Sequence, residues 1–521
     1  MPYLHGVYIY EDPTPVIAPL YCDSAIQVVV GTAPVNMAQD ISGAVNKPIL
    51  VNSFTEAVKR VGYSDNFSKY TLCQSIDASF RVFNIAPVIL INVLDPAKHS
   101  SSAADKEYAL YNRKVTVGQD GVLRDSVEVK GDGAALRPGI DFNTAFDDLG
   151  NLVIFTDTDY NRVSVSYNYL DPSKVTALDI IGGYNAQTGE YNGLELIEQI
   201  FPRLSVIPGQ ILAPGWSQIP AVNAVITSKL TNINMCFKCT GVSDIDTSQA
   251  DTYDKVNDWK NKNGYVNENL VVCWPKVQVG AKVYFYSAVW AALTAYVDTR
   301  HENVPYKSPS NELARITGTV AELSDVQPAV LQDPTGTVNG AYLEEGGVSL
   351  EAYLYIPDDW IKAHKEVYLD QAQANYLNSV GICSALNFNG WRSWGDNTSI
   401  YPASTDVKDR YIPIRRMFNW WGNTFILTYF QVVDNPINLR LIEAIVDSEN
   451  IRANGFQAKG MIASGKIDFD IDENPITDIL NGQIHFRQML ALFPPMEAAI
   501  NTLIFDPNAL RAYLGGGDIN G

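Results

Sequence analysis

The hydrophobic pattern of the chain predicts a domain in which strands and helices alternate. Four short apolar stretches are typical of strands buried on both faces of a sheet: residues 26–30, 88–93, 235–239 and 270–274. Helical patterns lie between and after them, at residues 53–62, 68–83, 194–201, 221–230 and 284–300. This alternation favours a mostly parallel sheet covered by helices.

Local signals mark both ends of the first predicted helix. Ser53 and Glu56 have the spacing of a capping box, in which the two side chains satisfy free backbone N–H groups of the first turn. Gly62 follows where the helical pattern stops, and glycine readily takes the backbone conformation that ends a helix. We therefore expect a helix between these residues.

Between residues 113 and 169 the apolar positions recur at every second residue instead. Segments such as 115–117 and 163–167 alternate apolar and polar side chains, as strands do when one face lies in a core. Turns rich in glycine and aspartate separate the strands, at residues 120–121 and 131–133. The pattern predicts an all-β module inserted into the α/β domain.

Both ends of the chain are apolar and have few local partners. Four prolines in residues 1–20 forbid a helix, although the same segment is rich in aromatic and aliphatic side chains. Residues 484–492 and 500–505 have the two-residue period of strands, with Pro494-Pro495 between them. Such segments pair either with an edge of their own domain or with a sheet edge of another subunit. The side chains expected to contact another subunit are Val7, Tyr8, Ile9, Val16, Ile17, Ile500, Thr502, Leu503, Ile504 and Phe505.

Length and composition limit the classes of protein to which the chain can belong. The chain has 521 residues, more than one hydrophobic core usually supports, so we expect three or four domains. A hydrophobic content of 46% with 18% charged residues is typical of folded proteins rather than disordered ones. The formal net charge of −20 argues against a nucleic-acid partner, because phosphate contacts need a basic surface.

No membrane insertion is expected. The longest apolar run, residues 85–94, contains Pro87 and Asn92 and is too short to span a bilayer. The first residues lack the basic stretch of a signal peptide. The six cysteines lack the spacing of a disulfide framework, which suits a reducing cytoplasm.

Residues 390–416 contain the most distinctive motif. The sequence Trp394-Gly395-Asp396-Asn397-Thr398 precedes the pair Arg415-Arg416, which we expect in an extended segment. This block resembles the C-terminal domain of contractile tail sheath proteins, found in bacteriophages with contractile tails and in related injection machines. Weaker matches lie elsewhere in the chain, in the order usual for the family, at residues 206–209, 274–277, 304–311, 474–475 and 494–498. Val304 stands where glycine is usual. The resemblance covers roughly residues 25–95 and 176–506.

Arginine and tryptophan dominate this block. Both combine a large contact surface with fixed hydrogen-bond geometry, so they are common in interfaces. Trp394, Arg410, Arg415 and Arg416 are therefore candidates for an interface or structural motif. The alternative is a solvated surface with satisfied ion pairs.

The resemblance implies an α/β multidomain fold. It has a subtilisin-like α/β core domain, an α+β C-terminal domain and extended N- and C-terminal arms, and the inserted all-β module matches the family only loosely. We divide the chain into an N-terminal arm (1–20), a first α/β segment of the core (21–95), the inserted β module (96–172), the subtilisin-like α/β domain (173–340), the C-terminal sheath domain (341–495) and the C-terminal arm and tail (496–521).

The function that the resemblance implies is structural. A sheath subunit polymerises around an inner tube, as six-fold rings stacked in a helical sheath, and contracts to drive the tube through a target cell envelope. The implied partners are other copies, the inner tail tube protein, and the baseplate and tail terminator proteins. The implied location is the virion tail or an equivalent particle, assembled in the cytoplasm of the bacterial host. A tube or baseplate component of the same machine is the alternative.

A subtilisin-like core also suggests a hydrolase, which would need a serine nucleophile, a histidine base and an aspartate. The five histidines lie in no setting typical of a subtilisin histidine: His5, His99, His301, His364 and His485. No helix start carries the matching serine motif, and no phosphate-binding loop is present. We expect no catalytic residue and no cofactor.

No metal site is expected either. Cys236 and Cys239 form a single C-x-x-C, and a strand there would place them on opposite faces, as buried apolar thiols. The acidic run 468–473 begins like a calcium loop but lacks the glycine and the closing glutamate. It is more typical of the solvated face of a strand.

A helix is predicted from Pro436, with Asn435 before it as the cap, to Gly455. Its expected buried stripe leaves two arginines outward and consists of Ile437, Leu441, Ile445 and Ile451. By analogy with sheath domains that line the tube, the possible tube contacts are Arg440, Arg452 and Lys459. The alternative is that the arginines balance nearby acidic side chains on the same helix.

Overall fold

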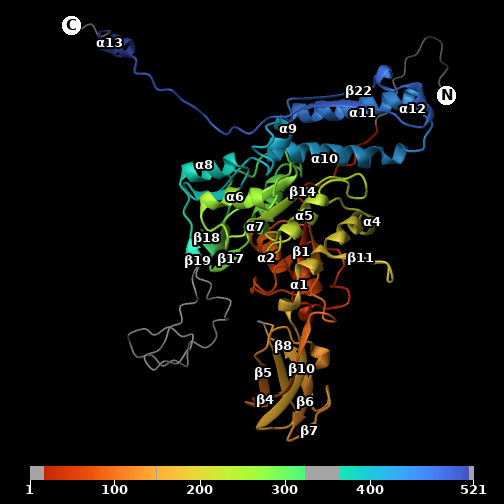
Figure 1. Cartoon of the computed structure of the whole chain (residues 1–521), viewed down its shortest axis with the longest axis vertical. Coiled ribbons are helices and arrows are strands. Elements are labelled where there is room, and N and C mark those ends of the chain that lie inside the picture. The colour runs from red at the N-terminus through yellow and green to blue at the C-terminus, as the bar shows by residue number, and fades with distance from the viewer. Residues whose placement is uncertain (1–16, 148–149, 323–363, 516–521) are drawn as a thin grey trace, which may run out of the picture.

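The computed structural model describes residues 17–147, 150–322 and 364–515. Four predicted arm residues, Val7, Tyr8, Ile9 and Val16, lie outside these ranges, as does the domain boundary placed near residue 340. In the described ranges the chain is a mixed α/β protein with several separate sheets (Figure 1).

A six-stranded sheet forms the core. Its strands lie in the order β15 (Leu270–Cys273), β14 (Thr240–Asp244), β13 (Gln210–Leu212), β1 (Gln27–Gly31), β3 (Val88–Asn92) and β2 (Ile49–Val51). Neighbouring strands are parallel except for β2, which runs antiparallel to β3. The central strands are buried along their length, as their continuous apolar runs predict.

Helices cover both faces of this sheet. On β14, the Ser243 hydroxyl donates to Asn223 of α5 (Pro220–Ser228) over 2.8 Å. The next residue, Asp244, accepts the Ser287 N–H of α7 (Tyr286–Thr299) over 2.8 Å. Successive strand residues point to opposite faces, so α5 and α7 lie on opposite sides. Helix α2 (Leu72–Ile76), which continues as π-helical turns over Asp77–Phe83, packs beside α7.

The predicted helix ends are confirmed for α1 (Phe54–Val61). The Glu56 N–H donates to the Ser53 hydroxyl over 3.2 Å, and the Glu56 carboxylate accepts the Asn52 N–H over 2.9 Å. Gly62 ends the helix with a φ of 79°. The apolar helix predicted at 284–300 is α7, which is buried on nearly all sides. The stretch at 194–201 is divided between a 3-10 segment (Gly193–Gln199) and α4 (Ile200–Leu204).

The predicted strand at 235–239 is wrong. Asn232, Asn234 and Met235 have φ values of 65°, 50° and 66°, so the chain turns there, and Met235 is 92% exposed. Asparagine tolerates this left-handed conformation, which explains the turn. The strand follows directly as β14, and Cys239 is buried whereas Cys236 is partly exposed.

The segment predicted as an inserted β module forms two sheets and has its own hydrophobic core. One sheet contains β4 (Ser100–Ala109), β10 (Arg162–Leu170), β6 (Glu128–Gly131) and β7 (Ala134–Ala135), and another contains β5 (Lys114–Val117), β9 (Leu152–Thr156) and β8 (Phe142–Phe146). Alternating side chains from both sheets form a hydrophobic cluster separate from the main one. Figure 1 shows the module projecting from the body at the end away from the last helices.

The last part of the chain contains several small sheets and two long helices. A four-stranded sheet joins β17 (Lys282–Tyr284), β16 (Lys276–Val279), β18 (Gly318–Glu322) and β19 (His364–Glu366). The elements that follow are α8 (Gln371–Ser379), β20 (Ser384–Asn387), β21 (Trp391–Trp394), α9 (Val407–Arg410), α10 (Ile412–Tyr429), α11 (Leu439–Ala458), β22 (Ser464–Asp468), α12 (Ile476–Leu480), β23 (Arg487–Ala491) and α13 (Pro507–Gly515). Strands β22 and β23 form a two-stranded antiparallel sheet that packs on α11. Among the helices that the structure describes, none combines the length and apolar character needed to cross a membrane.

Two predictions about this region are wrong. The pair Arg415-Arg416 lies in the first turns of α10 and not in an extended segment. Pro413 falls in the first turn, where its missing N–H costs nothing and its fixed φ suits a helix. Helix α11 begins after Asn438, whose side chain accepts the Leu441 N–H over 2.9 Å, and it continues past Gly455 to Ala458.

Candidate functional site: the bases of the two terminal segments

The N-terminal segment, residues 17–24, lies along α10 and α11. Its backbone N–H groups donate to hydroxyl side chains of these helices: Ile17 to Ser448 (2.8 Å), Leu20 to Thr428 (2.9 Å) and Cys22 to Thr424 (3.5 Å). A helix has no free edge for strand pairing, because its own backbone groups are bonded within it. Serine and threonine hydroxyls therefore supply the acceptors that an extended segment needs.

Aromatic packing holds the same segment from the side. The Tyr21 ring stacks on Trp420 with centroids 5.8 Å apart and meets the edge of Phe456 at 6.0 Å. The Trp420 indole N–H donates to the Cys22 carbonyl over 2.8 Å. Stacked pairs of this kind stabilise by about 1 kcal/mol beyond the area that they bury. The predicted arm residue Ile17 is thus on a segment fixed within its own chain.

A buried ion pair fixes the end of the segment. Arg416 of α10 donates through both terminal nitrogens to Asp298 of α7, one bond being 3.0 Å, and it also donates to the Ser24 carbonyl over 3.2 Å. The Ser24 hydroxyl completes the group by donating to Asp298 over 2.9 Å. The side chains of Arg416 and Asp298 are 3% and 0% exposed. Arg416 therefore joins three distant parts of one chain and presents no surface to a partner.

The base of the C-terminal arm, residues 496–515, is held by Glu497. Its carboxylate accepts from four side chains: Arg410 (2.6 Å), Tyr411 (3.3 Å), Asn397 (3.3 Å) and Asn378 (3.2 Å). Arg410 also donates to the Asn397 amide oxygen over 2.7 Å, so the donors are fixed relative to one another. A charge-assisted bond of this kind is stronger than one between neutral groups.

Asp396 lies beside this group and carries a perturbed carboxyl. Burial raises the pKa of Asp396 to about 6, against an opposing hydrogen bond from the Ser308 hydroxyl. The negative charge of Glu497 adds to the rise, and the Arg410 guanidinium counteracts it. The perturbation follows from packing at the base of the arm.

Beyond Glu497 the arm leaves the body (Figure 1). Its apolar side chains are exposed: Ile500 92%, Leu503 89%, Ile504 84% and Phe505 75%. Thr502 is exposed as well. In the described residues, no hydrogen bond joins 498–505 to any other part of the chain, and the segment forms no strand there. These five predicted arm residues are therefore extended and uncovered.

The other two residues of the predicted arginine and tryptophan motif are bonded within the chain. The Trp394 indole N–H donates to Asn375 over 3.0 Å, and Arg415 donates to Asp409 over 3.1 Å. All four residues of the motif thus have intramolecular partners. Arg416 joins the C-terminal region to α7 and to the N-terminal segment, Arg410 holds the base of the C-terminal arm, and Trp394 and Arg415 bond within the C-terminal region.

Of the three possible tube contacts, Arg452 is buried, and its predicted outward position is wrong. Arg452 and Glu449 form an ion pair in which each side chain is 1% exposed, and the guanidinium lies 4.0 Å from the centre of the Trp421 ring. Arg452 lies seven residues after Ile445, which places both on one face of the helix, and the buried stripe consists of Ile442, Ile445, Ser448, Glu449, Arg452, Ala453 and Phe456. Arg440 is exposed, as are Ile437 and Ile451, and Lys459 pairs with Glu302 over 2.5 Å.

Sequence reasoning missed Ser24, Asp298 and Glu497 as parts of this site. Glu497 stands in one of the motifs that resemble the family, but its sequence neighbours do not reveal which cation it meets. Asp298 ends an apolar helix, and a carboxylate there would have been a usable signal, since a buried charge needs a partner.

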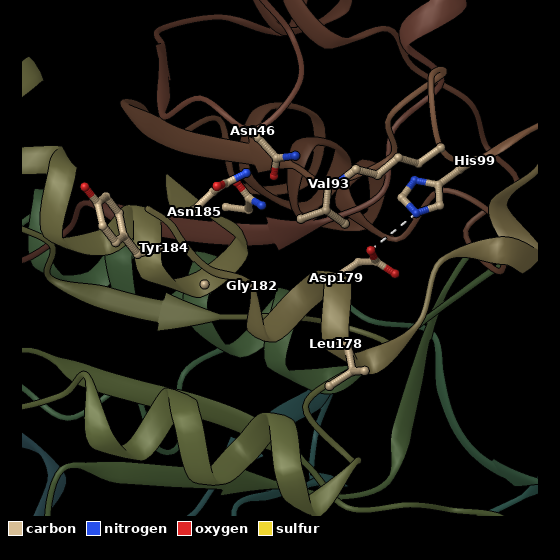
Figure 2. Close-up of a pocket in the computed structure, with 11 residues that line it drawn as sticks. Asn46, Val93, His99, Leu178, Asp179, Gly182, Tyr184 and Asn185 are labelled. Atoms are coloured by element: carbon tan, nitrogen blue, oxygen red, sulfur yellow. Dashed lines mark ion pairs between the residues drawn. The ribbon is translucent and has the colours of Figure 1, made fainter. Parts of the chain in front are cut away.

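A cavity of about 230 Å³ lies where the β module joins the core (Figure 2). His99 lines it, with Nε2 3.4 Å from an oxygen of Asp179 and with Nδ1 accepting the Asp95 N–H over 3.0 Å. Both ring nitrogens are therefore occupied. No serine, threonine or cysteine is among the described residues that line the cavity.

Comparisons with known proteins agree with this architecture. No family model matches the chain. The tail sheath protein of Burkholderia phage BcepMu is 24% identical over 517 residues, which cover 95% of each chain. The sheath of an extracellular contractile injection system, PVC, in its contracted state has a TM-score of 0.53 at 14% identity and covers 98% of this chain and 99% of that one. A chain of the anti-feeding prophage baseplate has a TM-score of 0.54 at 13% identity, with 97% and 100% covered.

The sequence match and the fold match each extend over almost the whole of both proteins. The chain is a homologue of phage tail sheath proteins and has the fold of the sheaths of contractile injection systems.

Proposed function

We propose that the chain is a structural subunit of a contractile tail sheath. Six-fold rings of it stack around an inner tail tube, between a baseplate and a terminator, and contraction drives the tube through a target envelope. The near full-length similarity to a phage tail sheath protein supports this function. The mostly parallel sheet covered on both faces supports a subtilisin-like core. The particle is a virion tail, or an equivalent device, assembled in the host cytoplasm.

The observation that carries the proposal is the exposed C-terminal arm. Four large apolar side chains stand in water on an extended segment, which costs free energy unless another surface covers them. Burying one such side chain contributes about 1.5 to 3 kcal/mol. Glu497 holds the base of the segment to its own subunit, so residues 500–505 are free to reach a neighbouring one.

The acceptor that we propose is the sheet of β22 and β23. A two-stranded sheet is marginal by itself, and its two outer edges have no strand partner among the described residues. A donated strand gains main-chain hydrogen bonds at such an edge, and its side chains set the register. We infer that residues 500–505 pair there from one neighbour and that residues 7–9 pair there from another.

The anchored bases give the arms a mechanical role. A buried ion pair and aromatic packing fix residues 17–24, and a partly exposed ion pair holds Glu497. Each subunit can therefore rotate and shift as a rigid body while its extended segments bend. Neighbours then stay linked throughout contraction. The driving free energy comes from interface gained on contraction, summed over many copies.

The test is a chain that ends at Ala498, which keeps Glu497 and loses the exposed segment. The full chain is expected to form wide tubes by negative-stain electron microscopy. The shortened chain should stay monomeric in sedimentation, with an unchanged melting temperature at low concentration. Tubes formed by the shortened chain would contradict the proposal.

Two other functions predict different results, one in the same electron microscopy and one in a labelling assay. A baseplate component would form single rings and no extended tubes. A subtilisin-like hydrolase would react with a serine-directed phosphonate probe, and labelling of the purified protein would favour it over a purely structural subunit.

Arg440 and Lys459 are proposed as contacts to an acidic tube surface. Both are exposed, whereas Arg452 is buried in its own subunit. The double variant Arg440→Glu and Lys459→Glu should lose co-sedimentation with the tube while still forming sheath contacts. Unchanged co-sedimentation would show that these cations serve only their own helix and Glu302.

A further inference from the structure

Helix α13, at the far end of the C-terminal arm, begins by local rules. The Asp506 carboxylate accepts the N–H groups of Asn508 and Ala509 over 2.9 and 3.0 Å, and Pro507 occupies the first helical position. Both features favour a helix start wherever the arm is placed. An isolated nine-residue helix is marginal in water, so α13 gains from packing on another surface.

One face of α13 is apolar and uncovered. Leu510, Tyr513 and Leu514 follow the spacing of i, i+3 and i+4, which places them on one side of the helix. They are 47%, 84% and 68% exposed. Figure 1 shows α13 standing away from the body at the end of the arm, so no described element of its own chain covers this face.

The position of α13 in the chain limits which surface of a neighbouring subunit it can contact. It follows residues 500–505 directly, and we propose above that these residues join the β22–β23 sheet of a neighbour. A helix that starts where an added strand stops emerges at one end of that sheet. The two ends are the turn region between β22 and β23, which contains α12, and the opposite end near Lys459.

The end with α12 has exposed aliphatic side chains. Ile476 and Leu480 are one turn apart on α12 and are 67% and 78% exposed, and Ile471 nearby is 64% exposed. Grouped exposed aliphatic residues of this kind mark interaction surfaces.

Charge distinguishes the two ends. At the α12 end, Asp468 pairs with Lys466 and Glu473 pairs with Arg487. Three further carboxylates lie there, on Asp470, Asp472 and Asp478, so this end is acidic overall. At the opposite end Lys459 pairs with Glu302. Within α13 the one charged residue is Arg511, next to the apolar face. Opposite charges at the rim of an interface set its register and orientation, so Arg511 favours the acidic end.

We propose that α13 docks on α12 of a second copy. Leu510, Tyr513 and Leu514 pack on Ile471, Ile476 and Leu480, and Arg511 faces the surrounding carboxylates. This inference rests on the proposed strand donation, which brings the two surfaces together. The arm thus has two contacts on its acceptor, a strand and a helix, and the helix adds affinity by being held at high local concentration.

The test compares chains that keep the donated strand. A chain ending at Phe505, and the double variant Leu510→Asp and Leu514→Asp, should each need at least about 10-fold more protein for half-maximal assembly. The matched control Ala512→Asp places one of these charges on the other side of α13 and should stay within about 2-fold of wild type. Assembly of the first two at wild-type concentrations would overturn the docking of α13.

A charge exchange identifies the acceptor. Arg511→Glu should raise the assembly concentration about 3-fold, and adding Asp472→Arg in the same chain should restore it. If the second change only adds to the defect, α13 does not lie against the acidic end and the proposal fails. A chain ending at Ala498 runs in parallel. If this shortened chain assembles, strand donation itself is wrong. If it stays monomeric, a negative result with the α13 variants contradicts only the docking of α13.

Discussion

The two terminal segments are similar in sequence character and opposite in structure. Residues 17–24 are bonded to hydroxyl and aromatic side chains of α10 and α11, and Arg416 and Asp298 bond to Ser24. Residues 498–505 leave the body after one carboxylate contact, with their apolar side chains exposed. An apolar extended segment must be covered, but its pattern does not say whether its own chain or another copy covers it. Four changes test this contrast.

The largest effect is expected for Arg416→Ala. Removing the arginine leaves Asp298 buried without its ion-pair partner, and loss of one partner from such a pair costs about 3 to 5 kcal/mol. Urea unfolding of the monomer at low concentration measures this cost. Arg487→Ala is the control, because its ion pair with Glu473 is exposed and should contribute less than about 1 kcal/mol. Equal losses in the two variants would mean that the Arg416 group does not fix the N-terminal segment.

The second test uses pH at the base of the C-terminal arm. The pKa of Asp396 is raised from 3.8 to about 6, so the folded state binds more protons than the unfolded state between these values. The free energy of unfolding contributed by Asp396 is therefore greatest at low pH and is lost as pH rises through 6, by about 3 kcal/mol at most. Asp396→Asn lacks this loss, so the variant should gain stability relative to wild type between about pH 4 and pH 6. A difference that stays constant over this range would contradict the burial of the carboxyl.

Tyr21→Ala should have a moderate effect. It removes the stack on Trp420 from a side chain that is 53% exposed, and we expect a loss of about 1 kcal/mol. Faster proteolysis within residues 17–24 should accompany the loss. Tyr21→Phe keeps the ring and should behave as wild type, so equal cleavage of the alanine and phenylalanine variants would exclude the stack as the cause.

The smallest effect on stability is expected for Leu503→Asp. Leu503 is 89% exposed, so the melting curve of the dilute monomer should match wild type to within about 0.5 kcal/mol. Assembly at higher concentration should fail, because an unpaired carboxylate cannot be buried in the interface. A destabilised monomer would show that this segment packs on its own chain, and the contrast between the termini would disappear.

Much of the core could be predicted from local signals. The strands at Val28, Leu90 and Val272 lie in apolar runs, and Ser53 and Gly62 bound a helix through their own side-chain and backbone chemistry. These features depend on residues close in sequence, so the sequence contains what is needed to find them.

The candidate site could be predicted only in part. Arg416 was recognised, but its partner Asp298 is 118 positions away, and no local pattern links the two. The predicted start of α11 is wrong because Asn435 and Asn438 are both suitable caps, and the side chain of the second accepts the Leu441 N–H. The inward position of Arg452 follows from its seven-residue spacing to the buried Ile445, whereas its contact with the Trp421 ring on another helix has no local sequence signal.

The β module leaves and rejoins the body at a single point. The Asp171 N–H donates to the His99 carbonyl over 2.8 Å, so the two connecting segments lie side by side. The module also has a hydrophobic core separate from that of the body, so it is a self-contained insertion. A short linker in its place, or an unrelated small domain with close termini, should leave the rest of the subunit able to fold. In the proposed sheath, a foreign domain inserted at this point would be present once per subunit.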